Sequence, residues 1–339
     1  MSITLQDVAK QAGVSMKTVS RVVNNERDVS DATRQRVLKV IQAVGYVPHI
    51  QAQRLASGRT RLVALHYPLS NPGLISNQIE LNFITGVVMG VAQEDYYFNL
   101  TTGPLTPPDL LKLCRGAHAD GLILMQIALR DWRVDMLREN HYPFVMIGRC
   151  GSNDGLSYID LDFESAILEV FAYLVELGHQ HIGFLAYPES WRQKGLGPAV
   201  RALEGFEKAV SKFNLSPLYR ESDQTVQSAY AATNDLLRED PRLTAFVVMH
   251  NTMAVGTLSA LQDKGRKVPN DCSMVGVAFG YEGELIIPPL TAINWSGHDI
   301  GRQAATMLIR QLKAEDPVPE QILVPPKLDV RRSTAPAPR

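Results

Sequence analysis

The sequence predicts an α/β protein with a small helical N-terminal head and a larger body built on parallel sheets. From residue 61 onward, continuous apolar runs alternate with amphipathic helical stretches, which is typical of parallel sheets covered by helices on both faces. Before residue 61 the apolar residues recur at helical spacing instead. The 339 residues, 45% of them hydrophobic, are enough for a small head and a body of one or two lobes.

The head is organised around residues 4–24, TLQDVAKQAGVSMKTVSRVVN, which predict two short helices joined by a tight turn. Thr4 can cap the first helix together with Asp7, and Gly13 can end it in a left-handed conformation. Ser15 begins the second helix. The apolar seam between the two helices is expected to consist of Val8, Val14, Val19 and Val22.

A third helix and a marginal fourth one complete the predicted head. Residues 30–45 predict a helix that begins at a Ser30 cap and ends at Gly45. Its apolar stripe, which closes a three-helix core, consists of Val37, Ile41 and Val44. The residues after Pro48 offer a last helical stretch of about eight residues, too short to be stable alone. We expect that stretch to fold only with support from DNA and a partner copy.

The charge of the head differs in sign from that of the body. Residues 1–61 hold ten Lys or Arg against four acids, a net charge of +6, and because the whole chain carries −1, the remainder carries −7. A basic head on an acidic body indicates nucleic-acid binding, since neutralising phosphates supplies most of the sequence-independent affinity. The alternatives are an ordinary pair of packed helices and a merely solvated charged face. Neither requires the charge to coincide with the helix pair, as it does here.

The body repeats a strand-then-helix pattern that suggests two lobes. Strand-like runs are RLVALHYP, YYFNLTT, DGLILM, FVMIGR, HIGFLAYP, AFVVMH and SMVGVAF. Helical stretches are expected around 78–94, 131–140, 162–178, 198–213, 226–239, 251–264 and 297–313. We expect the chain to cross between lobes near residues 160, 293 and 322. The predicted domains are a 1–46 head, a 47–60 hinge, a 61–330 body and a flexible 331–339 tail. Within the body, the first lobe would hold about 61–160 and 293–321, and the second about 161–292 and 322–330.

The run from Val8 to Thr60 resembles the LacI/GalR family of bacterial transcription regulators, and the similarity extends through the whole chain. The resemblance implies a helix-turn-helix head with a hinge helix, joined to a two-lobed body of the periplasmic-binding-protein-like kind. In that architecture an effector binds between the lobes. Its binding shifts lobe closure, which changes the spacing of two heads in a dimer and the folding of the hinge helices.

The resemblance also implies how the head contacts DNA. In the family the second helix lies in the major groove, and the two residues after the turn serine, here Met16 and Lys17, set operator preference together with Arg21. Lys17 and Arg21 can donate to guanine, whereas Met16 offers only apolar contact. The expected major-groove face comprises Ser15, Met16, Lys17, Thr18, Ser20 and Arg21. The expected contacts to the DNA backbone are Thr4, Asn24 and Arg34.

The hinge implied by the resemblance enters the minor groove as a dimer. Leu55 would wedge between base pairs, Ala52 would contact the partner helix, and His49 stands where the family usually has Asn. The full hinge set comprises His49, Ala52, Gln53, Leu55 and Ala56. Paired half-sites imply a homodimer on palindromic double-stranded operator DNA. The prolines of the tail cannot continue a heptad-repeat helix, so we expect no tetramer.

The candidate effector contacts lie just after strand ends or in the family's sugar-contact regions. They are His66, Tyr67, Gln126, Arg149, Tyr187, Arg201, Gln224, Asn251, Phe279 and Trp295. Polar groups mixed with flat aromatic rings suit sugar recognition, because hydroxyls need hydrogen bonds and pyranose faces need apolar surfaces. Rim packing is the alternative for any single aromatic residue among them.

Departures from the family pattern bear on which effector is bound. Thr252 and Ala278 replace two usual Asp residues, and Ala202 stands where the family has its sugar-contacting Arg. Arg201 lies one position earlier, about 100° around a helix. A simple galactoside in the usual pose is therefore disfavoured. The strand at 143–149 resembles members that respond to gluco-oligosaccharides, which favours a sugar inducer. A purine or phosphorylated corepressor remains the alternative.

Other classes of function are poorly supported by the sequence. It lacks the G-x-S-x-G, P-loop and H-E-x-x-H motifs, so we expect neither an enzyme nor a cofactor. His179 and His181 are interpreted as surface residues rather than metal ligands, and Asp160 and Asp162 as structural or hinge contacts. A non-regulatory sugar-binding protein would fit residues 61–330 but not the basic head. No apolar run of about eighteen residues and no signal peptide occur, so we expect a cytoplasmic, nucleoid-associated protein without membrane contact.

Overall fold

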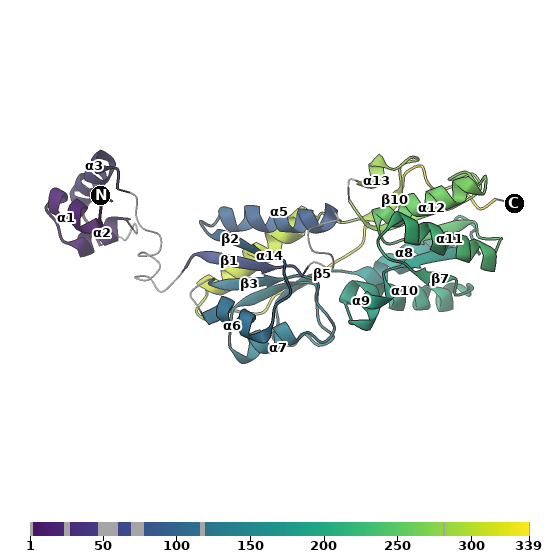
Figure 1. The fold of residues 1–339 in the computed structure, drawn as a ribbon, viewed down its shortest axis with the longest axis horizontal. Coiled ribbons are helices and arrows are strands. Elements are labelled where there is room, and N and C mark those ends of the chain that lie inside the picture. The colour runs from purple at the N-terminus through teal and green to yellow at the C-terminus, as the bar shows by residue number, and fades with distance from the viewer. Residues whose placement is uncertain are drawn as a thin grey trace. The chain divides into compact units, whose positions relative to one another are not determined.

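The computed structural model describes residues 3–23, 28–46, 60–68, 78–115, 119–280 and 282–338. The chain divides into two compact units, a head of residues 1–61 and a body of residues 62–339. Figure 1 shows the helical head and the α/β body, and each is described here by itself. Across the described parts of the chain, none of the helices combines the length and the apolar character that a membrane crossing requires.

The head contains the three helices that the sequence predicts, α1 (Leu5–Ala12), α2 (Met16–Val23) and α3 (Asp31–Val44). Gly13 and Gly45 end α1 and α3 with φ of 64°, the left-handed conformation that glycine adopts without strain. Ser30 occupies the cap position of α3, but its hydroxyl bonds to Thr33 Oγ1 and not to a backbone N–H. The buried core joins all three helices and consists of Val8, Ala9, Ala12, Val19, Val22, Val37 and Tyr46. Ala9, Ala12 and Tyr46 were not in the predicted core, and Val14, Ile41 and Val44, which were, are only partly buried against it.

The body holds two mainly parallel sheets, each with six strands among the described residues. The first sheet has the order β11-β5-β4-β3-β1-β2 and all of its pairs are parallel. Its strands are β1 (Leu62–His66), β2 (Tyr97–Thr101), β3 (Gly121–Leu124), β4 (Phe144–Ile147), β5 (Tyr158–Leu161) and β11 (Gln321–Val324). The second has the order β12-β10-β9-β8-β6-β7, with only β12 antiparallel. Its strands are β6 (Ile182–Ala186), β7 (Tyr219–Glu221), β8 (Ala245–Val248), β9 (Ser273–Phe279), β10 (Thr291–Asn294) and β12 (Leu328–Asp329).

Helices pack in pairs against these sheets. The first lobe, called the N-lobe, contains α5 (Gln78–Ala92), α6 (Pro107–Arg115), α7 (Trp132–Glu139) and α14 (Gly297–Lys313). The second, called the C-lobe, contains α8 (Phe163–Glu176), α9 (Glu189–Gln193), α10 (Gly197–Phe213), α11 (Val226–Glu239), α12 (Asn251–Asp263) and α13 (Glu282–Leu285). In Figure 1, α5 and α14 cover the face of the N-lobe sheet opposite to α6 and α7. In the C-lobe α8 packs on α10 and α11 on α12.

The chain crosses between the lobes after β5, β10 and β11. The predicted boundaries at 293 and 321 each fall slightly early. Strand β10 extends to Asn294 within the C-lobe sheet, and β11 pairs with β5 of the N-lobe up to Val324. Helix α14, which packs on α5, therefore joins the N-lobe after most of the C-lobe has been traversed.

The expectation of a flexible C-terminal tail is wrong for residues 331–338. Ser333 is fully buried, its hydroxyl donates to Met274 O at 2.6 Å, and it accepts from Thr291 N at 2.8 Å. Ala337 N donates to Leu177 O at 2.8 Å. The polar, proline-containing composition suggested disorder, but its backbone and hydroxyl groups find hydrogen-bond partners on the C-lobe.

The interpretation of His179 as a surface residue is also wrong. Its side chain is fully buried, and its ring nitrogens lie 2.9 Å from Thr244 Oγ1 and 3.0 Å from Ser273 Oγ. Burial lowers the pKa of His179. His181 is partly exposed and pairs with Asp240 at 2.8 Å. The two histidines thus have separate structural partners.

Candidate ligand cavity and nucleic-acid interface

The helix pair of the head presents a defined outer face. Thr4 and Asp7 form a reciprocal capping box, with Thr4 N donating to Asp7 Oδ2 at 2.9 Å and Asp7 N donating to Thr4 Oγ1 at 3.3 Å. Ser15 Oγ accepts from Thr18 N at 3.1 Å and so begins α2. Val19 and Val22 turn inward, and the first turn of α2, with Met16 and Lys17, faces outward.

The predicted DNA contacts differ in their solvent exposure. Ser15, Met16 and Lys17 are exposed, with Met16 54% exposed although its side chain is apolar. The predicted contacts that are half-buried are Thr18, Ser20, Arg21 and Arg34. The predicted contacts that lie outside the described residues are Asn24 and the hinge set of His49, Ala52, Gln53, Leu55 and Ala56.

A cavity of about 740 Å³, counting the solvent at its mouth, lies between the two lobes of the body. It is lined from the N-lobe by Ile79, Glu80, Phe83, Met125, Gln126, Ile127, Ile147, Gly148, Ile159, Asp160, Leu161 and Ile300. It is lined from the C-lobe by Phe163, Tyr187, Trp191, Leu196, Pro198, Gln224 and Ala278. Several of these residues, among them Met125, Gly148 and Tyr187, directly follow strand ends, where ligands of parallel sheets bind.

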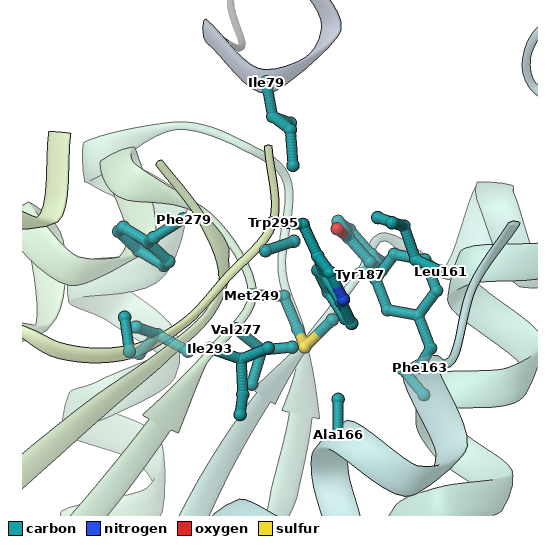
Figure 2. Packing of buried hydrophobic residues seen from close by; sticks show 14 of the residues in the cluster. Ile79, Leu161, Phe163, Ala166, Tyr187, Met249, Val277, Phe279, Ile293 and Trp295 are labelled. Carbon is teal, nitrogen blue, oxygen red and sulfur yellow. The ribbon is translucent and has the colours of Figure 1, made fainter. Parts of the chain in front are cut away.

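Aromatic rings form the apolar wall on the C-lobe side. Tyr187 and Trp191 stack with centroids 5.2 Å apart and planes 19° apart. Phe163 meets the edge of Tyr187, and Figure 2 shows Ile79 of the N-lobe pointing toward this group from the other side. Flat apolar surfaces of this kind suit the faces of a pyranose ring.

The N-lobe contributes a hydrogen-bonded polar cluster of Tyr67, Glu80 and Gln126. The Tyr67 hydroxyl donates to Glu80 Oε2, and the Gln126 side chain hydrogen-bonds to both groups. Burial raises the pKa of Glu80, which favours its uncharged form. Gln126 has a left-handed φ of 51°, and buried Arg133 supports it by donating to Gln126 O at 2.9 Å.

A second polar cluster consists of Arg149, Asp160 and Arg201. Arg149 Nε lies 3.2 Å and Arg201 Nη1 3.7 Å from Asp160 Oδ2. Burial raises the pKa of Asp160 to about 6, although both guanidinium groups oppose the shift. Among the described residues, the buried Gln224 Nε2 lacks a hydrogen-bond partner, and Asp160 Oδ2 has only its two arginine contacts. The cavity therefore contains an acceptor on one lobe and a donor on the other.

The predicted effector contacts divide into three groups. Those that line the cavity are Gln126, Tyr187 and Gln224. Those that lie behind lining carboxyl groups are Tyr67, which bonds to Glu80, and Arg149 and Arg201, which pair with Asp160. Those that lie elsewhere are His66, Asn251, Phe279 and Trp295.

The four residues of the last group have partners that explain their positions. His66 contacts Gly103 O at 3.1 Å and Arg133 Nη1 at 3.0 Å inside the N-lobe. Asn251 Oδ1 accepts from Thr252 N at 2.7 Å, at the start of α12. Phe279 is turned away from Tyr187 in Figure 2 and packs in the C-lobe core. Trp295 is buried beside Phe163 and donates to Pro325 O at 3.0 Å, so it anchors two crossing segments.

Sequence reasoning missed Glu80, Asp160 and Trp191. Asp160 was interpreted as a structural contact, which its two arginine partners support, yet it also lines the cavity. Asp162, by contrast, caps α8 by accepting from Ser165 N at 3.1 Å. Trp191 lies in the short helix α9 and Glu80 on α5, so neither is marked in the sequence by a preceding strand. Among the described residues, no three His, Cys, Asp or Glu side chains converge as a metal site would need.

Two family models match the chain. Residues 4–49 match the model described as bacterial regulatory proteins, lacI family, and residues 171–334 match the model of a periplasmic binding protein-like domain. The HTH-type transcriptional regulator CelR of Thermobifida fusca is 31% identical over 97% of this chain and 98% of its own length. A solved CelR–cellobiose complex has a TM-score of 0.72 at 30% identity, covering 98% of this chain and 99% of that one. The lac repressor dimer bound to operator and the anti-inducer ONPF has a TM-score of 0.85 at 26% identity, covering 99% and 100%.

Proposed function

The chain belongs to the lacI family of bacterial regulatory proteins, and from this we propose that it is a transcriptional repressor released from its operator by a neutral oligosaccharide. As a regulator of this kind it acts as a homodimer on palindromic DNA, at the nucleoid in the cytoplasm. The observation that carries the effector assignment is the cavity between the lobes, which is lined by the stacked Tyr187–Trp191 wall, the Asp160 carboxyl group and the Gln224 amide group.

The head supplies the operator contacts in this proposal. Exposed Lys17 and Met16 open helix α2, where they meet base edges when the helix enters a major groove. Lys17 donates to guanine O6 and N7, and Met16 packs on a thymine methyl. The phosphate contacts come from Thr4 and from the half-buried Arg34.

The charges around the cavity favour a neutral effector over a phosphorylated one. Among the described residues that line it, Glu80 and Asp160 are the only ones with carboxyl or basic groups, and both are acids. Arg149 and Arg201 lie behind Asp160 and are already paired with it. A phosphate would meet carboxyl oxygens first, whereas sugar hydroxyls can donate to Asp160 and accept from Gln224. The solved cellobiose complex of CelR supports a disaccharide as the first ligand to test.

The test is fluorescence anisotropy of the full-length protein on its own upstream DNA at one fixed salt concentration. Cellobiose, glucose 6-phosphate and hypoxanthine are titrated separately. We expect cellobiose to weaken DNA binding about tenfold or more, a coupling of at least ~1.4 kcal/mol. Trp191→Ala should abolish the response, whereas Trp132→Ala, at an exposed tryptophan outside the cavity, should retain it.

Other outcomes would separate the parts of the proposal. A response only to glucose 6-phosphate or hypoxanthine would overturn the neutral-sugar assignment and leave the DNA-binding role standing. A ligand that tightens DNA binding would make the protein a corepressor-dependent regulator. If specific DNA binding is absent under all conditions, a non-regulatory sugar-binding protein is favoured instead.

A further inference from the structure

Two loops from different lobes form a short antiparallel bridge beside the cavity. Leu129 N of the N-lobe donates to Gly195 O at 2.8 Å, and Gly197 N of the C-lobe donates to Ile127 O at 3.0 Å. The bridge is centred on Ala128 and Leu196. Ile127 and Leu196 also line the cavity, so the bridge forms part of its rim.

Arg201 adds side-chain contacts to the same junction. It lies on α10 of the C-lobe and is only 5% exposed. Its Nη2 donates to Arg149 O at 3.1 Å and to Cys150 O at 2.9 Å, and its Nη1 lies 3.7 Å from Asp160 Oδ2. All three of these partners belong to the N-lobe. The guanidinium group therefore spans the two lobes and does not line the cavity.

Gly197 makes room for this guanidinium group. A Cβ atom at position 197 would lie 2.3 Å from Arg201 Nη1, closer than any real contact allows. It would also lie 3.4 Å from Ile127 O, the acceptor in the bridge. Gly197 and Arg201 are one helical turn apart, so the backbone bridge and the arginine contacts depend on each other.

We infer that Arg201 and the 127–129/195–197 bridge form a latch that holds the lobes closed, and that Arg201 is a positioning residue and not an effector contact. The latch contacts run directly from lobe to lobe, so they need no third molecule to form. Its effect on effector affinity rests on the proposed function, but the latch itself does not.

The latch sets the effector affinity through the population of the closed state. A ligand that requires the closed cavity binds with its intrinsic affinity multiplied by the closed fraction. Loss of the latch lowers that fraction and weakens every such ligand by the same factor. A direct contact would instead discriminate between ligands that have and lack the contacted hydroxyl.

The first experiment measures hydrogen exchange of the full-length protein without added sugar. The amides of Leu129 and Gly197 are protected only while the bridge is closed. In Arg201→Lys we expect peptides covering these amides to exchange about tenfold faster, because an ammonium group cannot reproduce the fork that holds both carbonyls. Gly197→Ala keeps Arg201 but displaces its guanidinium group, and it should also speed the exchange of these peptides.

A matched control is Arg192→Lys, which changes an arginine paired with Glu221 inside the C-lobe. It should leave the exchange of both bridge peptides unchanged. Unchanged exchange in Arg201→Lys and Gly197→Ala, each with a native thermal transition, would overturn the latch.

The second experiment compares cellobiose with its deoxy analogues. Arg201→Lys should weaken the binding of every one of these sugars by the same factor. A loss of affinity confined to one analogue pair would make Arg201 a direct contact and overturn its positioning role. Faster exchange in a protein that binds none of these sugars would uphold the latch and reject the proposed effector. The two failures are therefore distinguishable.

Discussion

In the proposed DNA interface, much of the recognition rests on one exposed side chain, Lys17. It lies in the first turn of α2, next to Met16, with its side chain open to solvent. We expect Lys17→Ala to relax sequence preference and to cost on the order of 1–3 kcal/mol at its base pair. Selection from a randomised operator library measures the change, and indistinguishable site preferences of the two proteins would contradict it. Lys10→Ala, on α1, is the matched control and should retain the preference.

His66 gives the N-lobe an acid sensitivity that is unrelated to ligand binding. Burial, with a smaller effect from nearby Arg133, lowers the pKa of His66 from 6.5 to about 4. A base whose folded-state pKa is lowered contributes its full stability above pH 6.5 and loses it as the pH falls toward 4. The loss is on the order of 3 kcal/mol by pH 4.

Urea unfolding of His66→Gln at a series of pH values tests this sensitivity. The free energy of unfolding should fall less steeply between pH 6.5 and 4 than in the wild type. Some slope should remain, because burial also lowers the pKa values of His179 and His250. His141→Gln, at an exposed histidine, should keep the wild-type slope, and an equal slope in the two variants would contradict the assignment.

At the scale of elements, the predicted strands and helices were those with long, strongly periodic patterns. All seven strand-like runs of the body and the three head helices occur in the structure. Short or edge elements were not predicted, namely β5, β7, β10, β11, β12, α6, α9 and α13. Their identity depends on neighbours that are distant in the chain. Strand β11, for example, is defined by its pairing with β5, more than 150 residues earlier.

The position of the cavity was predicted more reliably than the residues that line it. Strand ends indicated Gln126 and Tyr187, because the topology of parallel sheets places them at one edge, and the family resemblance indicated Gln224. Arg201 was expected to contact the effector, and its rotation by one helical position turns it toward the N-lobe carbonyls instead. Such a difference depends on side-chain direction across two lobes, which local sequence patterns do not encode.

The pairing of α5 with α14 depends on glycines at the contact. A Cβ atom at Gly86 would lie 2.1 Å from His298 O, and one at Gly301 would lie 2.0 Å from Phe83 O. Backbone atoms cannot yield locally, so Gly86→Ala must separate the two helices. We expect a loss of stability on the order of 1–3 kcal/mol or more, seen as a lower Tm. Gly103→Ala, where no atom lies within 4 Å, is the control, and equal Tm values would contradict the close packing.

At the scale of the whole molecule, the head and the body differ in charge and in the kind of site they contain. The head carries the positive charge, and the body has a core of its own that encloses the cavity. A fragment of residues 62–339 should therefore bind cellobiose within about twofold of the full chain while losing operator binding. Isothermal titration measures the first property and anisotropy the second. Loss of cellobiose binding in a folded fragment would show that the cavity needs the head.

The threefold crossing of the chain also fixes the order in which the protein can be completed on the ribosome. The head is synthesised first and contains its whole core within the first 46 residues. The N-lobe cannot finish at that stage, because α14 and the edge strand β11 emerge only after residues 297–324 have been translated. Until those residues are made, the face of α5 that packs on α14 lacks its partner helix. A stop codon before residue 321 would remove β11 from the N-lobe sheet and β12 from the C-lobe sheet, so one truncation would leave both lobes incomplete.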